Sequence, residues 1–327
     1  MVSPGVDGKM NYKNQYMKRS RLLVLIFLPV AGLFQNCRGG VPFSVYSADT
    51  TAPCVVILDA SRQGGSISPM LMGFNIVYNN APDSVWRKGR GKIPLLLQQL
   101  GVGVLRYPGG TVTTFYHWEH PSGQGHKDRW DPSYDALKDK SPSRVMDLDE
   151  YIGVCQELHT QPLIGINMGS GMKYDRVSEG IRETLRLLKY CRQKGAAVKY
   201  FYLGNEPYQR DANYTFTPED YAEMVNRYAA AMKNFDHGIK IIVNTKPFWR
   251  NPSSADLSYT KTLILKAGKN IDFIDVHDYW AWGHATYALW QSEIPMEIGA
   301  TGISYKGQRK FYRALAASLG YPGIEMV

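Results

Sequence analysis

The chain has 327 residues, of which 44% are hydrophobic and 20% charged, and its formal net charge is +9. This composition is typical of a globular protein with one large domain, and it excludes a collagen-like or mainly disordered chain. Part of the positive charge lies in the N-terminal tail, and no long basic run or nucleic-acid motif follows it. We therefore expect no nucleic-acid partner.

The N-terminal segment predicts an export signal. Residues 17–34, MKRSRLLVLIFLPVAGLF, have a basic start and then an apolar stretch that is too short to span a bilayer. We expect an extension plus signal peptide over 1–36, a linker and leading segment over 37–66, and the folded domain over 67–327. The protein would then be secreted, periplasmic or on the outer surface, with an uncleaved anchor or a lipid on Cys37 as alternatives.

The cysteines give no sign of a metal site. None of the four lies in a C-x-x-C pair or at zinc-binding spacing from a histidine, so we expect no metal and no cofactor. Cys155 and Cys191 fall within predicted helices, where a free cysteine is most simply a small buried hydrophobic residue.

Beyond the linker, apolar runs alternate with segments of helical periodicity. The expected strands are 69–78, 102–108, 162–169, 200–206, 240–245, 273–279 and 323–327. The expected helices are 93–100, 147–159, 176–194, 218–236, 254–268 and 305–319. Thr217 is a candidate N-cap, and Gly195 a candidate helix end. This alternation predicts an α/β fold with a parallel sheet, and the absence of a Gly-rich phosphate loop favours a (β/α)8 TIM barrel over a dinucleotide-binding sheet.

Polar side chains collect at the expected carboxyl ends of these strands, where (β/α)8 enzymes carry their catalytic groups. In chain order they are Asn75, Arg106, Asn167, Asn205 with Glu206, Asn244, and His277 with Tyr279. Such groups suit the hydroxyls of a sugar, and indoles suit its apolar C–H faces. Four tryptophans flank these ends, and we expect two of them, Trp118 and Trp280, to contact ligand; the others are Trp249 and Trp282.

Three stretches resemble the α-L-arabinofuranosidases and related retaining glycoside hydrolases with (β/α)8 barrels. They are LRYPGGTVTTFYHW (105–118), YFYLGNEPY (200–208) and VHDY (276–279), in matching order and spacing. The resemblance implies a carbohydrate substrate from a plant or algal polysaccharide or oligosaccharide. It also implies that Glu206 is the general acid/base, that Asn205 binds the sugar 2-hydroxyl, and that His277 and Tyr279 line the site.

The chemistry of retaining hydrolysis gives Glu206 a physical role. Such an enzyme needs two carboxyl groups ~5–5.5 Å apart, one protonated and one ionised. Repulsion between them, with partial burial, keeps the acid protonated near neutral pH. The acid then protonates the leaving oxygen and later activates water.

Two positions depart from the family pattern. The family usually carries an acidic residue just after the first strand, where this chain has Asn75 and Ile76, and often Asn or Cys where this chain has Thr111. Because both positions serve sugar recognition, another pentoside or a hexoside remains open as substrate.

The family nucleophile is a glutamate at the carboxyl end of the seventh strand. Its spacing from His277 places it at or just past Val327. Glu325 lies too early in that strand, and Glu297 lies in a loop or helix stretch. We therefore expect a truncated, inactive fragment with about seven strands, without the β-sandwich that usually follows the barrel.

Other classes of function remain open. A non-catalytic carbohydrate-binding protein could use the same barrel scaffold. An inverting hydrolase would need a distant base such as Asp278. An aldolase is disfavoured because no lysine lies at an expected strand end. The sequence does not indicate an oligomeric state.

Overall fold

The computed structural model describes residues 68–87, 91–124, 126–209, 216–247, 254–278 and 304–327. The chain divides into two compact units, Met1–Gln63 and Gly64–Val327, and every described residue belongs to the second. The expected export signal and the lipidation candidate Cys37 therefore lie outside the described residues. Within the described segments, no helix combines the length and apolar character needed to cross a membrane.

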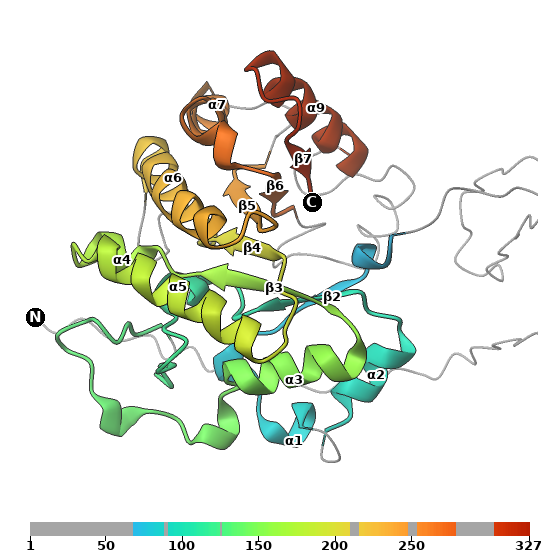
Figure 1. Ribbon diagram of the computed structural model, residues 1–327, viewed down its shortest axis with the longest axis vertical. Coiled ribbons are helices and arrows are strands. Elements are labelled where there is room, and N and C mark those ends of the chain that lie inside the picture. The colour runs from blue at the N-terminus through green and yellow to red at the C-terminus, as the bar shows by residue number, and fades with distance from the viewer. Residues whose placement is uncertain (1–67, 88–90, 125, 210–215, 248–253, 279–303) are drawn as a thin grey trace, which may run out of the picture. The chain divides into compact units, whose positions relative to one another are not determined.

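Seven parallel strands form one sheet in sequence order (Figure 1). Each pairs with the next along the chain, so β1 and β7 are the two edges of an open half-barrel. All seven coincide with the expected apolar runs, which confirms the predicted incomplete (β/α)8 barrel. The strands are β1 (Gly73–Asn75), β2 (Val104–Tyr107), β3 (Gln161–Ile166), β4 (Tyr200–Leu203), β5 (Lys240–Thr245), β6 (Phe273–Val276) and β7 (Glu325–Met326).

The six expected helices are also present, and two short ones were not expected. Thr217 caps its helix, because its hydroxyl accepts a hydrogen bond from the backbone N–H of Asp220 at 3.1 Å. Gly195 follows the end of α5 in the left-handed region, with φ of 67°, as a glycine at a helix end commonly does. The helices are α1 (Asp83–Trp86), α2 (Ile93–Gln99), α3 (Leu148–Leu158), α4 (Gly169–Lys173), α5 (Val177–Gln193), α6 (Pro218–Phe235), α7 (Ser254–Ala267) and α9 (Tyr305–Ser318).

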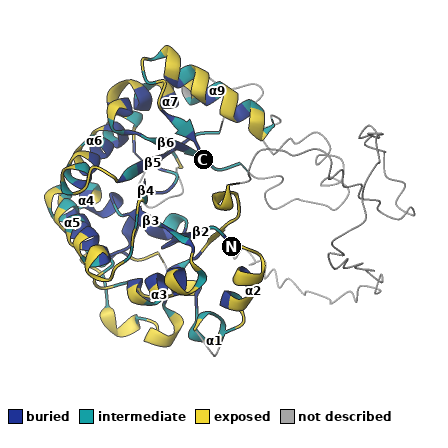
Figure 2. Ribbon diagram, turned by 45° about the vertical axis from the view of Figure 1, so that its right-hand side comes forward, coloured by how far each residue is buried: buried dark blue, intermediate teal, exposed yellow. Residues whose placement is uncertain are grey.

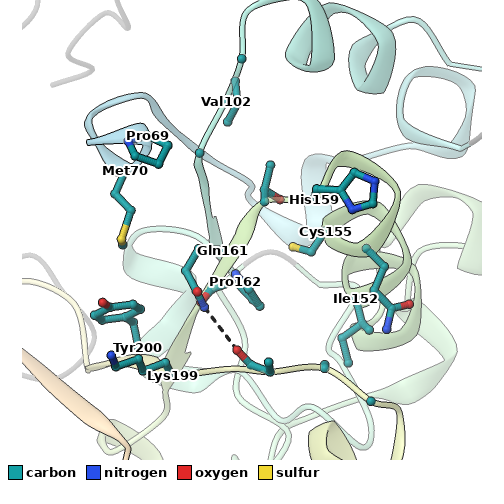
Figure 3. A pocket seen from close by; sticks show the side chains of 17 residues that line it. Pro69, Met70, Val102, Ile152, Cys155, His159, Gln161, Pro162, Lys199 and Tyr200 are labelled. Carbon is teal, nitrogen blue, oxygen red and sulfur yellow. Dashed lines mark hydrogen bonds between the residues drawn. The ribbon is translucent and has the colours of Figure 1, made fainter. Parts of the chain in front are cut away.

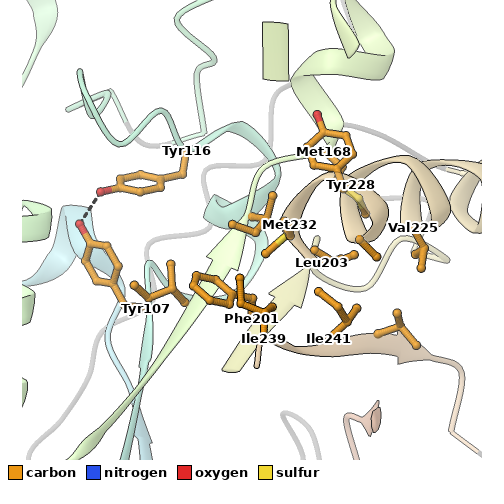
Figure 4. Packing of buried hydrophobic residues seen from close by; sticks show 14 of the residues in the cluster. Tyr107, Tyr116, Met168, Phe201, Leu203, Val225, Tyr228, Met232, Ile239 and Ile241 are labelled. Atoms are coloured by element: carbon orange, nitrogen blue, oxygen red, sulfur yellow. Dashed lines mark hydrogen bonds between the residues drawn. The ribbon is translucent and has the colours of Figure 1, made fainter. Parts of the chain in front are cut away.

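The hydrophobic core lies between the outer face of the sheet and these helices. The helices turn their buried sides toward the strands and their exposed sides outward (Figure 2). Phe201 and Leu203 of β4 and Ile241 of β5 pack near the buried side of α6 (Figure 4). Fully burying a side chain of this size contributes roughly 1.5–3 kcal/mol. The α6 members of this cluster labelled in the figure are Val225, Tyr228 and Met232.

Tyrosines also join the sheet to the segments around it. The hydroxyls of Tyr107 and Tyr116 are hydrogen-bonded at 2.5 Å (Figure 4), and the ring of Tyr107 stacks on that of Tyr151 in α3. The Tyr221 hydroxyl of α6 donates to the Leu203 carbonyl at 2.7 Å, at the end of β4. These buried bonds fix the carboxyl ends of β2 and β4, where the candidate site lies.

The inner face of the sheet needs a glycine at position 165. A Cβ there would lie 2.3 Å from a ring carbon of Tyr202 and 2.6 Å from the methyl of Thr113. Tyr202 cannot move away freely, because its hydroxyl donates to the Gly109 carbonyl at 2.7 Å and is bonded to Thr113 at 2.8 Å. Gly165 therefore leaves room for the Tyr202 ring, which the Arg106 guanidinium contacts.

Replacing Gly165 by alanine should destabilise the protein by ~1–3 kcal/mol, as overpacking in a filled interior generally does. Urea unfolding followed by circular dichroism would measure this. Gly153→Ala is the matched control. Gly153 lies on the exposed side of α3 with no atom within 4 Å of the new Cβ, so alanine should leave stability unchanged or raise it by ~0.5–1 kcal/mol. Equal unfolding midpoints for the two variants would contradict the role given to Gly165.

Candidate active site

Arg106 on β2 is the first organising group at the carboxyl end of the strands. Its Nη1 donates to Asn75 Oδ1 at 3.1 Å and its Nη2 to Asn205 Oδ1 at 2.7 Å. The guanidinium carbon lies 4.2 Å from the centroid of the Tyr202 ring, within the range of a cation–π contact. Arg106 therefore joins the ends of β1, β2 and β4 in one arrangement.

The backbone of Glu206 adopts an uncommon conformation. Its φ is +43°, in the left-handed region, which costs a non-glycine residue roughly 1–2 kcal/mol. The backbone N–H of Glu206 donates to Asn244 Oδ1 at 3.0 Å, at the end of β5. Strained residues of this kind are concentrated at functional sites, where the surrounding structure holds them.

The carboxylate of Glu206 meets His277, which follows β6. Glu206 Oε1 lies 2.7 Å from His277 Nδ1, and His277 Nε2 lies 3.1 Å from Asp275 Oδ2. Asn244 Nδ2 also donates to Asp275 Oδ2, at 2.6 Å. The side chains of Glu206 and His277 are only 20% and 15% exposed, so these polar contacts are largely screened from water.

The electrostatics of this cluster favour a charged histidine. Burial disfavours the imidazolium, but the hydrogen bonds to Asp275 and Glu206 outweigh it and raise the pKa of His277 to about 9. Burial also acts against ionisation of Asp275, yet the hydrogen bond and charge of His277, with the charge of Arg106, hold the pKa of that carboxyl below its usual value. The pair is therefore an ion pair at neutral pH.

Five of the expected site residues gather in this one place, from four different strands. They are Asn75, Arg106, Asn205, Glu206 and His277. Expected residues Tyr279 and Trp280, with Trp249 and Trp282, lie outside the described residues. Asn75 ends the first strand and Ile76 follows it, where the family usually has an acidic residue. Asn75 contacts Arg106, whereas Ile76 is buried in the core and 1% exposed.

The structure does not bring Asn167 and Trp118 to this cluster. The Asn167 side chain exchanges hydrogen bonds with Ser170 of α4, at 2.6 and 3.0 Å. The Trp118 indole N–H donates to the Glu183 carbonyl of α5 at 3.2 Å, and its ring packs against Tyr190. Trp118 thus contacts the helix layer, because the part of the loop that carries it lies against α5.

The cluster includes two further residues. Asn244 is one of the polar strand ends found in the sequence, without an individual role assigned to it, and Asp275 is not singled out there. The available signal for Asp275 was its spacing: residues two apart on a strand face the same way, so Asp275 and His277 share the inner face of β6.

A hollow of about 760 Å³ lies at the opposite, amino-terminal ends of β2, β3 and β4 (Figure 3). Met70, Ile152, Cys155 and Tyr200 are among its lining residues, and Gln161 Nε2 donates to the Ala197 carbonyl beside it at 3.4 Å. No carboxylate is among the described residues that line it. Since the hollow lies at the opposite ends of the strands from Glu206, it is separate from the carboxylate cluster.

Two other carboxylates considered from the sequence point toward α9. Glu325 pairs with Arg309 and Arg313 at 3.4 and 3.2 Å and lies level with Phe273, two residues before Asp275 on the neighbouring strand. It therefore lies too early in β7 to reach the cluster, as expected. Asp278 accepts a hydrogen bond from Gln308 of α9 at 3.3 Å. Glu297 lies outside the described residues.

The comparison with protein families rests on the same segments. The model for the α-L-arabinofuranosidase 1 domain matches residues 96–287, more than half of the chain. The chain belongs to this family. The match contains the Arg106, Glu206 and His277 segments, so the cluster lies within the part of the chain that defines the relationship.

Curated relatives agree with this assignment. The chain is 27% identical over 216 residues to an intracellular exo-α-(1→5)-L-arabinofuranosidase from Bifidobacterium longum, covering 59% of this chain and 35% of that protein. It is 31% identical over 198 residues to α-L-arabinofuranosidase C from Emericella nidulans, covering 55% of this chain and 38% of that protein.

A solved structure has the same fold. The crystal structure of α-L-arabinofuranosidase from Thermotoga maritima, an arabinose complex, matches with a TM-score of 0.54 and 26% identity, covering 75% of this chain and 49% of that chain. The chain thus spans about half the length of this family member, and less of the curated relatives.

A second buried network in the present chain stabilises the loop after β2. His117 Nδ1 lies 2.8 Å from Glu183 Oε2, and its Nε2 lies 3.0 Å from Asp128 Oδ1. Burial disfavours the charged ring, but the hydrogen bonds to Asp128 and Glu183 outweigh it and raise the pKa of His117 to about 9. Asp128 Oδ2 accepts from Ser170 at 2.5 Å, so this network reaches Asn167 at the end of β3.

This network predicts a loss of stability at alkaline pH. Because the pKa of His117 rises from 6.5 to about 9 on folding, the imidazolium contribution is complete below the lower value and is lost as pH rises through the higher one. The free energy of unfolding should fall over that range by at most about 3 kcal/mol for this histidine, with a similar term from His277. Urea unfolding at several pH values would measure the fall.

His117→Gln should remove part of this pH dependence, because glutamine does not titrate. His120→Gln is the matched control: His120 is exposed and the variant should keep the wild-type profile. An unchanged profile in His117→Gln would show that the ring is not charged in the folded protein.

Proposed function

We propose that this protein acts as a retaining glycoside hydrolase on α-L-arabinofuranosides or a related glycoside of plant or algal polysaccharides and oligosaccharides, with Glu206 as the general acid/base. The observation that supports this most directly is that Glu206 is hydrogen-bonded through both its backbone and its side chain. Asn244 binds its strained backbone at 3.0 Å, and His277 binds its carboxylate at 2.7 Å. A merely solvated carboxylate at a strand end would need neither contact.

The geometry supports different roles for the two carboxyl oxygens of Glu206. Glu206 Oε1 is engaged by His277, so Oε2 is the atom that would face the glycosidic oxygen. The hydrogen bond between Oε1 and Nδ1 holds the carboxyl group in this orientation, and the proton given to the leaving group would be carried by Oε2. Water activation in the second step would then return a proton to Oε2.

Sugar orientation would fall to Arg106 and Asn205. Arg106 donates to Asn205 Oδ1 at 2.7 Å, which fixes the amide so that its NH2 group is the free donor. A donor held in this way suits the oxygen of a sugar 2-hydroxyl. Asn75, on the other side of Arg106, would take part of the place that an acidic residue holds in other family members.

The second carboxylate of the reaction is not assigned to a described residue. A retaining mechanism needs it ~5–5.5 Å from the acid. Among the carboxylates that the structure describes near the strand ends, Asp275 is occupied by His277 and Asn244, and Asp278 accepts from α9. Turnover by this protein is therefore expected only where a second carboxylate completes the site.

We also propose that the protein is exported. The support is the basic and apolar sequence of residues 17–34 alone.

In a form of the protein that carries both carboxylates of the reaction, Glu206→Ala should slow hydrolysis of unactivated arabinofuranosyl oligosaccharides by ~10²–10⁴-fold, the usual contribution of general acid catalysis. An aryl glycoside with a good leaving group should lose much less in the first step, because departure scarcely needs a proton. Azide should restore turnover by replacing the activated water, and it should give a glycosyl azide of retained configuration.

Glu223→Ala is the control, since Glu223 is a surface residue of α6 with a 64% exposed side chain. The same loss on both classes of substrate, with no effect of azide, would argue against the acid/base role. Binding of the oligosaccharide without any turnover, measured by calorimetry, would instead favour a carbohydrate-binding protein.

The departures at the first two strands predict a shifted substrate preference. Because Asn75 is uncharged, Ile76 is buried and Thr111 replaces the Asn or Cys that the family often has there, a simple aryl α-L-arabinofuranoside should be a poor substrate. A panel of aryl glycosides would rank the alternatives, and Thr111→Asn should raise kcat/KM for the arabinofuranoside. If the wild-type protein prefers the arabinofuranoside by a wide margin, this interpretation is wrong.

A further inference from the structure

Four residues at the ends of β4, β5 and β6 form a closed hydrogen-bonded ring. Glu206 binds Asn244 through its backbone and His277 through its carboxylate. Asn244 and His277 in turn both bind Asp275, at 2.6 and 3.1 Å. Each member contacts two others, so none can turn without breaking the ring.

A single oxygen of Asp275 closes this ring. Its Oδ2 accepts from the Asn244 amide and from His277 Nε2, so one carboxylate fixes both groups that hold Glu206. The Asn244 arm orients the backbone of Glu206, and the His277 arm orients its side chain. Asp275 has no bond to Glu206 itself in the described structure.

We infer that Asp275 is the positioning residue of this site: through Asn244 and His277 it sets both the orientation of Glu206 and the atom of His277 that faces it. The inference rests on the proposed role of Glu206 as acid/base. Asp275 does not touch the reacting atoms, so its effect is transmitted entirely by its two partners.

The bond to Asp275 determines the tautomer of His277. A carboxylate accepts but does not donate, so Nε2 must carry a hydrogen in every charge state that keeps this contact. The remaining nitrogen, Nδ1, then either donates to Glu206 or accepts its carboxylic proton. One proton is thus shared by Nδ1 and Oε1, and this contact fixes the rotation of the Glu206 carboxyl group.

The charges around Asp275 agree with this assignment. The His277 hydrogen bond and charge, with a contribution from Arg106, lower its pKa against the effect of burial. Arg106 is not its hydrogen-bond partner, because both of its terminal nitrogens bind Asn75 and Asn205. The titratable groups whose charges interact with Asp275 or His277 include Arg106, Tyr202, Glu206, Tyr221 and Tyr305.

Titration of His277 by NMR tests the inference without requiring turnover. The chain has 7 histidines, so 13Cε1-histidine labelling with His277→Gln for assignment would identify the signal. In the wild-type chain it should titrate near pH 9. In Asp275→Asn the midpoint should fall by ~1–3 units, because a carboxylate within hydrogen-bond distance is replaced by a neutral amide.

Asp272→Asn is the matched control. Asp272 precedes the same strand, but its carboxylate binds Lys233 and Lys240 at 2.9 and 3.0 Å, away from His277. This variant should leave the His277 midpoint unchanged. An unshifted midpoint in Asp275→Asn, or an equal shift in both variants, would overturn the inference.

The wild-type chain offers a test that does not depend on the folding of any variant. Above the His277 midpoint, 15N chemical shifts report which ring nitrogen keeps its hydrogen. The inference requires the Nε2–H tautomer, and an Nδ1–H tautomer would overturn it.

The activity profile separates this inference from the proposed function. The alkaline limb of kcat/KM should follow the shared proton of the His277–Glu206 pair, and it should move down in Asp275→Asn by the shift seen in NMR. If Glu206→Ala left hydrolysis unchanged while the NMR shift was found, the proposed function would fail and the positioning role would stand. The NMR result alone decides whether Asp275 has the positioning role.

Discussion

The cost of burying charge on the inner face of the sheet controls the arrangement of this site. An ion transferred from water to a protein interior loses several kcal/mol unless partners replace its hydration. Arg106 is compensated by two amide oxygens and a tyrosine ring, and His277 by two carboxylates. Because removing one partner leaves another charge uncompensated, these side chains are fixed relative to one another before any ligand arrives.

A second buried charge is compensated in the same way beneath the loop that follows β2. There His117 lies between Asp128 and Glu183, all three at most 9% exposed. The two histidines therefore occupy equivalent electrostatic settings, one inside the sheet and one between a loop and a helix. In both, an imidazolium joins segments that are distant in the sequence.

Most of the fold could be predicted from the sequence, whereas the site could be predicted only in part. The apolar runs mark the strands because outward residues such as Phe201 and Val243 must be buried against helices. Arg106, Glu206 and His277 could be selected because they end such runs. The spacing of Asp275 from His277 was a signal for this residue, but its contact with Asn244 could not be predicted, because it depends on the register of β5 with β6. The orientation of Trp118 could not be predicted either, because it depends on how the long loop after β2 folds.

The members of the cluster lie far apart along the chain. Arg106 is 99 positions from Asn205, and Glu206 is 71 positions from His277. Contacts between distant segments form only after much of the chain entropy has been lost, and proteins dominated by such contacts fold slowly. The site should thus be assembled late, when β4, β5 and β6 have already paired. Any intermediate that precedes this step would expose Arg106, Glu206 and Asp275 to water as separate, fully hydrated ions, with none of the contacts that orient them in the folded chain.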